Sequence, residues 1–152
     1  MKEVSFLRPN GHADERSLLE LEKMLGRPLP SDYREFLLRY NGGRLAGDFW
    51  AYSVMEPYKE EFSQEYPSGG VGLHYFHGIG TGKGFADLVE HAHLRDADRT
   101  VPQEVLPIAA DGCGDHICVG VCQPVYGVVF FVDHELYDGP RDKDKRPFSR
   151  NR

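Results

Sequence analysis

Three apolar stretches near the end of the sequence are separated by turns of only a few residues, and this spacing constrains the fold most. The stretches are VLPIAA, HICVGVC and GVVFFVDHE, at residues 105–110, 116–122 and 127–135. Each is rich in β-branched or aromatic residues, as strands are. Between them lie the connectors DGCGD and QPVYG, which have the composition of turns. Parallel strands need a crossover of a dozen or more residues, so links this short predict an antiparallel meander.

The beginning of the chain has the period of a helix. Three leucines recur at i, i+3 and i+7 and predict a helix over residues 14–25. Its N-cap is either Asp14 or Ser17, the latter in a capping box with Glu20. Gly26 is placed to end the helix, because glycine adopts the left-handed conformation without strain.

A second helix is predicted after the connector RPLP, with Ser31 as its N-cap. Four apolar residues repeat there at helical spacing. They are Tyr33, Phe36, Leu37 and Tyr40. The run Asn41–Gly43 ends the helix, because asparagine and glycine tolerate left-handed backbone.

The remaining patterns complete an α+β domain. We expect strands at residues 48–54 and 71–79, an acidic surface loop or a short irregular helix over 56–70, and a third helix over 85–96. With no second core or repeat, residues 1–152 form a single domain of N-terminal helices packed on a mixed, mostly antiparallel sheet. Residues 138–152 are polar and are expected to be a partly frayed tail.

The net charge of −6 is unevenly distributed along the chain. Residues 138–152 hold six basic and three acidic side chains, so the rest of the chain carries −9. Such an acidic chain is poorly suited to nucleic acid and better suited to a basic protein partner, although net charge also simply favours solubility. No stretch is apolar enough to span a membrane or to form a signal peptide, so a cytoplasmic location is expected.

Three motifs in this order resemble the SMI1/KNR4 (SUKH) superfamily. They are LGRPLPSDYREFLLRYNGG at residues 25–43, VLPIAADGCGDHICVGV at 105–121 and GVVFFVDHE at 127–135. The resemblance extends over roughly residues 14–136. It implies a single α+β domain without catalytic activity. In bacteria it implies an immunity protein that binds and neutralises a cognate toxin, often a nuclease or deaminase. The fungal members regulate cell-wall synthesis through protein contacts, which leaves a regulatory scaffold as an alternative.

The glycine-rich stretch HYFHGIGTGKGF, residues 74–85, does not fit a phosphate-binding fingerprint. A P-loop around Lys83 requires glycine at His77 and a hydroxyl residue at Gly84. The dinucleotide fingerprint fails in both registers. The glycines are better explained by backbone freedom at a strand-to-helix turn, with a weak anion site at the helix start as the alternative.

Cysteines and histidines offer a second possible chemistry. Cys113, His116, Cys118 and Cys122 have the residue types of a zinc site. Along a strand, however, Cys118 and Cys122 would lie about 13 Å apart, so buried structural thiols are favoured. A thiol catalyst made of Cys113 and His134 remains an alternative. His91 and His93 do not share a helix face and are expected to be solvated.

The sequence therefore predicts a protein-binding domain with no catalytic residue, cofactor or metal, and a basic secreted toxin as its partner. Carboxylates would steer the basic partner and aromatic side chains would supply contact area. The residues predicted to bind the partner are Glu56, Tyr58, Glu60, Glu61, Phe62, Glu65, Tyr66, Asp111, Asp115 and Glu135. A small-ligand binder or enzyme that uses the glycine loop or a Cys/His pair is the competing class.

Overall fold

The structure is a computed structural model of the chain. It describes residues 5–50, 72–98, 101–112 and 114–134, with backbone alone at 47–50, 72 and 95–98. The predicted acidic loop and the predicted tail lie outside the described residues.

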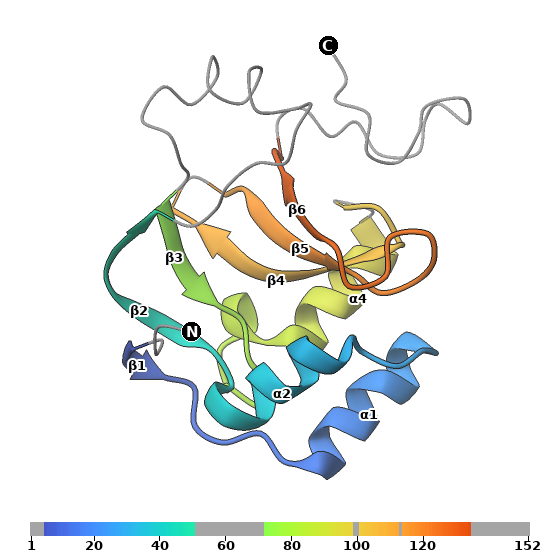
Figure 1. The fold of residues 1–152 in the computed structure, drawn as a ribbon, viewed down its shortest axis with the longest axis horizontal. Helices are drawn as coiled ribbons and strands as arrows, with labels where there is room; N and C mark the ends of the chain where they lie inside the picture. Colours follow the sequence, from blue (N-terminus) through green and yellow to red (C-terminus); the bar gives the residue numbers. More distant parts are fainter. Residues whose placement is uncertain (1–4, 51–71, 99–100, 113, 135–152) are drawn as a thin grey trace.

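The described strands form one six-stranded sheet in the order β1-β2-β3-β4-β5-β6 (Figure 1). The strands are β1 (Phe6–Pro9), β2 (Gly43–Trp50), β3 (Gly72–Phe76), β4 (Val105–Asp111), β5 (His116–Gly120) and β6 (Val129–Val132). Every neighbouring pair is antiparallel, so the predicted meander is confirmed and extends across the whole described sheet. The expected parallel component is limited, among the described residues, to an isolated bridge between Gly78 and Asp87.

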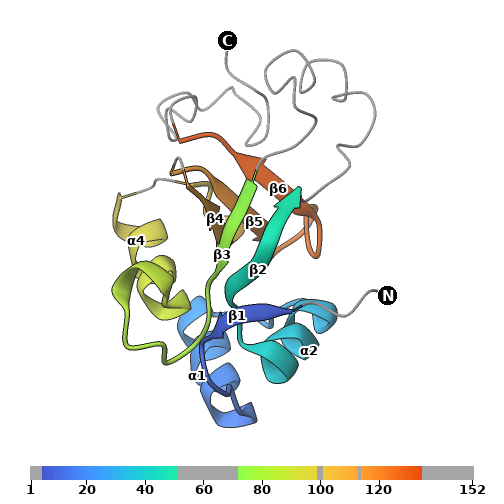
Figure 2. The same ribbon diagram turned by 90° about the vertical axis from the view of Figure 1, so that its left-hand side faces the viewer.

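Three α-helices and one short 3₁₀ helix accompany the sheet. They are α1 (Glu15–Leu25), α2 (Ser31–Tyr40), η1 (Gly84–Ala86) and α4 (Leu88–Asp98). Figures 1 and 2 show α4 against one face of the sheet, and α1 and α2 together at one end of it. The α+β class is confirmed. No helix in the described part of the chain is long and apolar enough to cross a membrane.

The start of α1 is fixed by Asp14. Its carboxylate accepts a hydrogen bond from the Ser17 backbone N–H at 2.8 Å, and the Ser17 hydroxyl accepts one from the Asp14 N–H at 3.1 Å. Of the two predicted caps, the box of Ser17 with Glu20 is therefore wrong. The helix ends at Gly26, whose φ of +69° is left-handed.

The start of α2 differs from the prediction by one residue. Ser31 is the first helical residue, the N-cap is Pro30, and no side chain caps the helix. Proline suits this position because its missing N–H needs no partner there. Tyr33 and Leu37 are buried, as the apolar period predicts.

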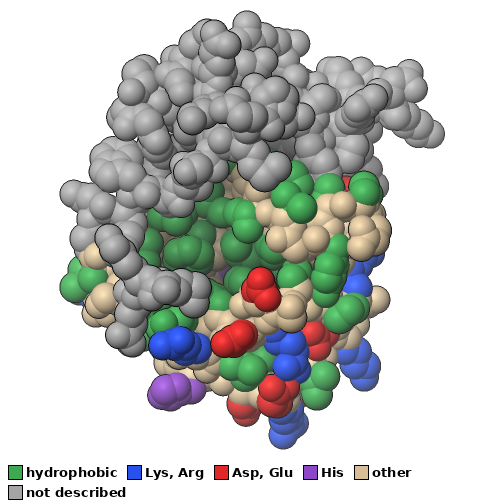
Figure 3. Space-filling model, in the orientation of Figure 1, with side chains coloured by type: hydrophobic (Ala, Val, Ile, Leu, Met, Phe, Trp, Pro, Cys, Tyr) green, Lys and Arg blue, Asp and Glu red, His purple; other side chains and the backbone are tan. Residues whose placement is uncertain are grey.

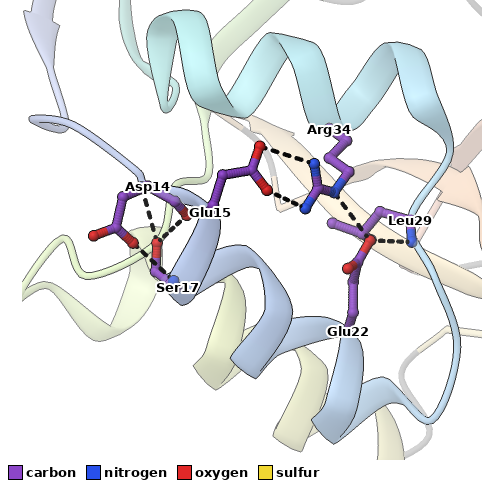
Figure 4. A network of polar contacts seen from close by, with 6 residues as sticks. All are labelled: Asp14, Glu15, Ser17, Glu22, Leu29 and Arg34. Atoms are coloured by element: carbon purple, nitrogen blue, oxygen red, sulfur yellow. Dashed lines mark hydrogen bonds and ion pairs between the residues drawn. The ribbon is translucent and has the colours of Figure 1, made fainter.

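An ion-pair network holds α1 and α2 side by side (Figure 4). The Arg34 guanidinium contacts both carboxylate oxygens of Glu15, one of them at 3.1 Å, and its Nε lies 3.4 Å from a carboxylate oxygen of Glu22. Glu22 also accepts a hydrogen bond from the Leu29 N–H at 2.9 Å. One arginine thus fixes the angle between the two helices and the loop that joins them.

The main core lies between the three α-helices and strands β4 and β5. Its fully buried members include Leu18, Leu21, Leu37, Leu88 and Leu106. A smaller core contains Val101, Val105, Cys118 and Val132. β4 and β5 contribute to both cores, which explains why they are apolar along most of their length.

The end of α2 meets the end of β3 at Asn41. This residue is 1% exposed and has a left-handed φ of +49°. Its amide nitrogen donates to the Ile79 carbonyl at 2.9 Å, and its amide oxygen accepts from the Ile79 N–H at 2.8 Å. Asn10 donates to the Asn41 carbonyl at 3.0 Å and to the Phe76 carbonyl at 3.2 Å. The amide of Asn41 therefore satisfies backbone groups that would otherwise be buried without partners.

We predict that Asn41→Ala lowers the free energy of unfolding by about 2–4 kcal/mol, because it leaves the Ile79 backbone unpaired and because alanine tolerates left-handed φ less well than asparagine. Asn41→Gly should cost about 1 kcal/mol less, since glycine also leaves Ile79 unpaired but adopts left-handed φ without strain. Urea unfolding at neutral pH measures both values. Equal losses for the two variants would contradict the backbone part of this account, and a loss below about 0.5 kcal/mol for Asn41→Ala would contradict the hydrogen-bond part.

Candidate functional site

Two of the predicted partner-binding residues lie together where β4, β5 and β6 meet. We call Asp111, Asp115, Asp133 and His134 the Asp–His cluster. Asp111 ends β4, Asp115 precedes β5, and the other two follow β6. The antiparallel pairing brings these strand ends to the same edge of the sheet.

The turn from β4 to β5 is closed by its own aspartates. The Asp111 carboxylate accepts a hydrogen bond from the Asp115 N–H at 2.9 Å, and the Asp111 N–H donates to the Asp115 carbonyl at 3.2 Å. Gly114 has a φ of +102°, which explains a glycine in this turn. The Asp/Gly composition that predicted a turn is thus accounted for by backbone geometry.

Asp115 and His134 form the centre of the cluster. One Asp115 carboxylate oxygen accepts from the His134 ring Nδ1 at 2.8 Å and from its backbone N–H at 3.1 Å. The Asp115 side chain is 9% exposed and that of His134 is 46% exposed. The histidine ring also lies beside Gly114, at 3.5 Å from where a Cβ would stand. The DGCGD and VDHE motifs, which sequence reasoning treated separately, are therefore one structural unit.

The chemistry open to this cluster is limited. Oxygen or nitrogen atoms of Asp115, Asp133 and His134 lie within 4.8 Å of one another, close enough to surround a small cation. The direct Asp115–His134 bond makes the pair stable without an ion. A carboxylate that orients a histidine is also part of a nucleophile–base system. The Cys113 nucleophile of that alternative lies outside the described residues, so the thiol-catalyst hypothesis stays a prediction.

The other predicted partner-binding residues cannot be placed. Glu135 and all the predicted residues between positions 56 and 66 lie outside the described residues. Their role stays a prediction. Of the two that are described, Asp111 is half-buried and Asp115 is buried. The Asp111 carboxylate binds the Asp115 N–H of its own turn, and the Asp115 carboxylate binds the His134 N–H after β6. Their carboxylates are therefore less available to a partner than the sequence suggested.

The glycine loop holds a carboxylate of its own where a phosphate would bind. Asp87 accepts hydrogen bonds from the Thr81 N–H at 2.9 Å and, with its other oxygen, from the Val89 N–H at 3.0 Å. It thereby caps the start of α4 and closes the loop. Gly80 and Gly82 have left-handed φ values of +67° and +68°. Both observations favour the backbone explanation of this loop over a phosphate site.

Cys118 has the environment of a structural thiol. It is fully buried in the smaller core, and burial raises its pKa well above the ordinary value. A metal ligand must be a thiolate, which this environment disfavours. The interpretation of Cys118 as a core residue is therefore supported by its surroundings.

Aromatic side chains gather where α2 meets β1 and β3. The Phe36 ring centroid lies 5.2 Å from that of Phe76, 5.6 Å from that of Tyr40 and 6.3 Å from that of Phe6, and all four side chains are half-buried. Figure 3 shows hydrophobic side chains gathered on one face of the molecule, with acidic side chains below them in that view. Large half-exposed aromatics near carboxylates are typical of protein-binding surfaces.

We predict that Asp115 and His134 stabilise the fold as a pair. Asp115→Ala should lower the free energy of unfolding by about 1–3 kcal/mol, because it removes the acceptor of two hydrogen bonds. A double-mutant cycle with His134→Ala should give a coupling energy of about 1 kcal/mol. In the control cycle, the exposed His12→Ala should show no coupling to Asp115→Ala. Additive losses for Asp115 and His134 would mean that their contact contributes nothing.

Comparison with known proteins identifies the fold family. Residues 12–148 match the SMI1/KNR4 family (SUKH-1). The chain is also similar to the SPbeta prophage-derived uncharacterized protein YokK of Bacillus subtilis (strain 168), with 32% identity over 133 residues. The aligned part is 82% of this chain and 64% of that relative, so the chain spans less than two thirds of the relative's length. No solved structure matches the chain. The chain therefore belongs to the SMI1/KNR4 family (SUKH-1), as its three motifs predicted.

Proposed function

We propose that this protein is an immunity protein that binds a secreted bacterial toxin and blocks the toxin's active site by occlusion. The observation that carries the proposal is the family match over residues 12–148, since the SUKH family is a protein-binding, immunity-type family. The family is generally non-catalytic, so the proposed mechanism is stoichiometric binding rather than turnover. The protein would act in the cytoplasm of the cell that makes it.

Charge supports a basic toxin domain as the partner. The net charge of −6 would accelerate encounter with a basic surface, and toxins that act on nucleic acid must carry such a surface. The hydrophobic side chains gathered on the face seen in Figure 3 would supply contact area.

The predicted docking segment remains the glutamate- and aromatic-rich stretch between residues 56 and 66. Asp111 and Asp115 would act indirectly, by holding the edge of the sheet in shape, since their carboxylates are bonded within the Asp–His cluster. The half-buried aromatics around Phe36 offer a second contact surface among the described residues.

Co-expression with any candidate toxin domain found beside its gene tests the proposal. We expect the protein to restore growth and to co-purify with the toxin at one-to-one stoichiometry, because occlusion needs one protein for each active site. A protein that neither restores growth nor co-purifies would contradict the toxin proposal. Recovery of an endogenous partner instead would favour the regulatory scaffold.

A pair of charge-matched variants tests the docking segment. Replacing Glu60, Glu61 and Glu65 by lysine adds two positive charges at each position and takes the net charge from −6 to 0. The control makes the same replacement at Glu20, Glu35 and Glu90, three exposed helix residues. We expect the first variant to slow association with the toxin by at least tenfold at low salt and the control by far less. Equal effects would show that overall charge, rather than this segment, steers the partner.

A further inference from the structure

Three histidines from three different elements meet between α4 and the sheet. His77 follows β3, His91 lies in α4 and His116 begins β5. The ring centroids of His77 and His91 are 3.8 Å apart, and those of His91 and His116 are 6.1 Å apart. We call these three residues the histidine cluster. The expectation that His91 is solvated is wrong, because it is half-buried against His77, whereas His93 is exposed.

The histidine cluster contains buried nitrogen atoms without partners. His77 is 1% exposed, and neither of its ring nitrogens has a hydrogen-bond partner among the described residues. The same holds for Nδ1 of His116. The ring Nε2 of His91 lies 3.0 Å from the Phe85 carbonyl, which can only accept, so this nitrogen donates. A further proton on His77 would therefore have no acceptor within the described structure.

The surroundings of His77 and His116 favour their neutral forms. Burial, and next the proximity of His91 and His116, lowers the pKa of His77 to about 2. Burial also lowers the pKa of His116, with a further contribution from His91. Two carboxylates and one more histidine bear on His116 from the strand ends. They are Asp111, Asp115 and His134, of which the carboxylates oppose the lowering and the histidine adds to it.

The histidine cluster also connects α4 to the segment that precedes it. The bond from His91 to the Phe85 carbonyl ties the helix to η1. His77 donates its backbone N–H to the Ile108 carbonyl of β4 at 2.9 Å, which ties the other end of the cluster to the sheet. Displacement of His91 from His77 would therefore loosen both α4 and η1. Phe85, which is 69% exposed, lies on that segment.

We propose that the histidine cluster is an acid-sensitive latch, which holds α4 and η1 against the sheet while its imidazoles are neutral and releases them when the imidazoles take up protons. A proton on His91 places a cation 3.8 Å from the His77 ring, and a proton on His77 is a buried charge without a partner. Either event opposes the packing of α4. The latch is independent of the toxin proposed as partner.

The direction of the pH effect follows from linkage. An unfolded or released histidine has a pKa near 6.5, and His77 in the closed latch has a lower one. The open state therefore binds more protons below about pH 6.5, and the closed state loses stability as the pH falls. For one histidine that stays neutral when closed, the opening constant should rise about thirtyfold between pH 7.5 and pH 5.0.

Hydrogen exchange on the full chain tests the latch. We expect the opening constant of α4 amides, corrected for the intrinsic exchange rate, to rise by at least tenfold from pH 7.5 to pH 5.0. The opening constant of α1 amides should change by less than threefold. An α4 constant that does not change with pH would overturn the proposal, and so would equal changes in α1 and α4, because those indicate global unfolding.

Two variants and one control assign the effect to the histidine cluster. His77→Leu should reduce the pH dependence of α4 opening to less than threefold. His91→Gln should reduce it by a smaller factor, because His77 remains, whereas the exposed His93→Gln on the same helix should keep the wild-type dependence. A wild-type pH dependence in the folded His77 or His91 variant would overturn the proposal.

A measurement on the unmodified protein covers the case in which the variants do not fold. In an NMR titration, the His77 imidazole should remain neutral in the native protein down to pH 5.0. Titration of His77 near pH 6.5 in the native state would overturn the latch.

Discussion

The buried amide of Asn41 is the contact on which the arrangement of helices and sheet depends. It pairs with both backbone groups of Ile79 and so fastens the end of α2 to the chain that leaves β3. The two backbones touch directly there. A Cβ at Gly78 would lie 2.1 Å from the Asn41 carbonyl, and one at Gly42 would lie 2.6 Å from the Phe76 carbonyl. The Asn-Gly-Gly motif is thus a packing requirement, and all three of its residues are buried.

Much of the acidic character of the chain serves the backbone. Asp14 and Asp87 cap α1 and α4, while Asp111 and Asp115 hold the β4–β5 turn and the end of β6. Each of these short side chains accepts backbone N–H groups that would otherwise lack partners. A count of carboxylates therefore overstates the charge that can face a partner. Longer glutamate side chains on exposed positions are better placed for that role, which agrees with a docking segment rich in glutamate.

The sequence predicted the elements whose signal is local. The leucine period of α1, the Asn-Gly-Gly end of α2 and the short links between β4, β5 and β6 were sufficient. The sequence did not reveal β1, a four-residue edge strand that depends on pairing with β2. It also missed the Asp115–His134 bond and the meeting of His77, His91 and His116, because those contacts join residues far apart in the chain and have no periodic pattern. The sequence signal for the Asp115–His134 bond was the co-occurrence of the DGCGD and VDHE motifs. The meeting of the three histidines had no sequence signal.

The two helical sides of the molecule respond to acid in different pH ranges. The side-chain hydrogen bond to Arg34 is the main cause of the lowered pKa of Glu15. The Glu15–Arg34 ion pair is therefore present above about pH 4.5 and is lost as the pH falls further. The contribution of His77 and His116 is lost from about pH 6.5 downward, since burial lowers the pKa of both in the folded state and they take up protons when released. Between these two values, acid weakens the attachment of α4 while the α1–α2 pair keeps its ion pairs. A fold held by carboxylates on one side and by neutral imidazoles on the other should therefore loosen at α4 before it unfolds as a whole.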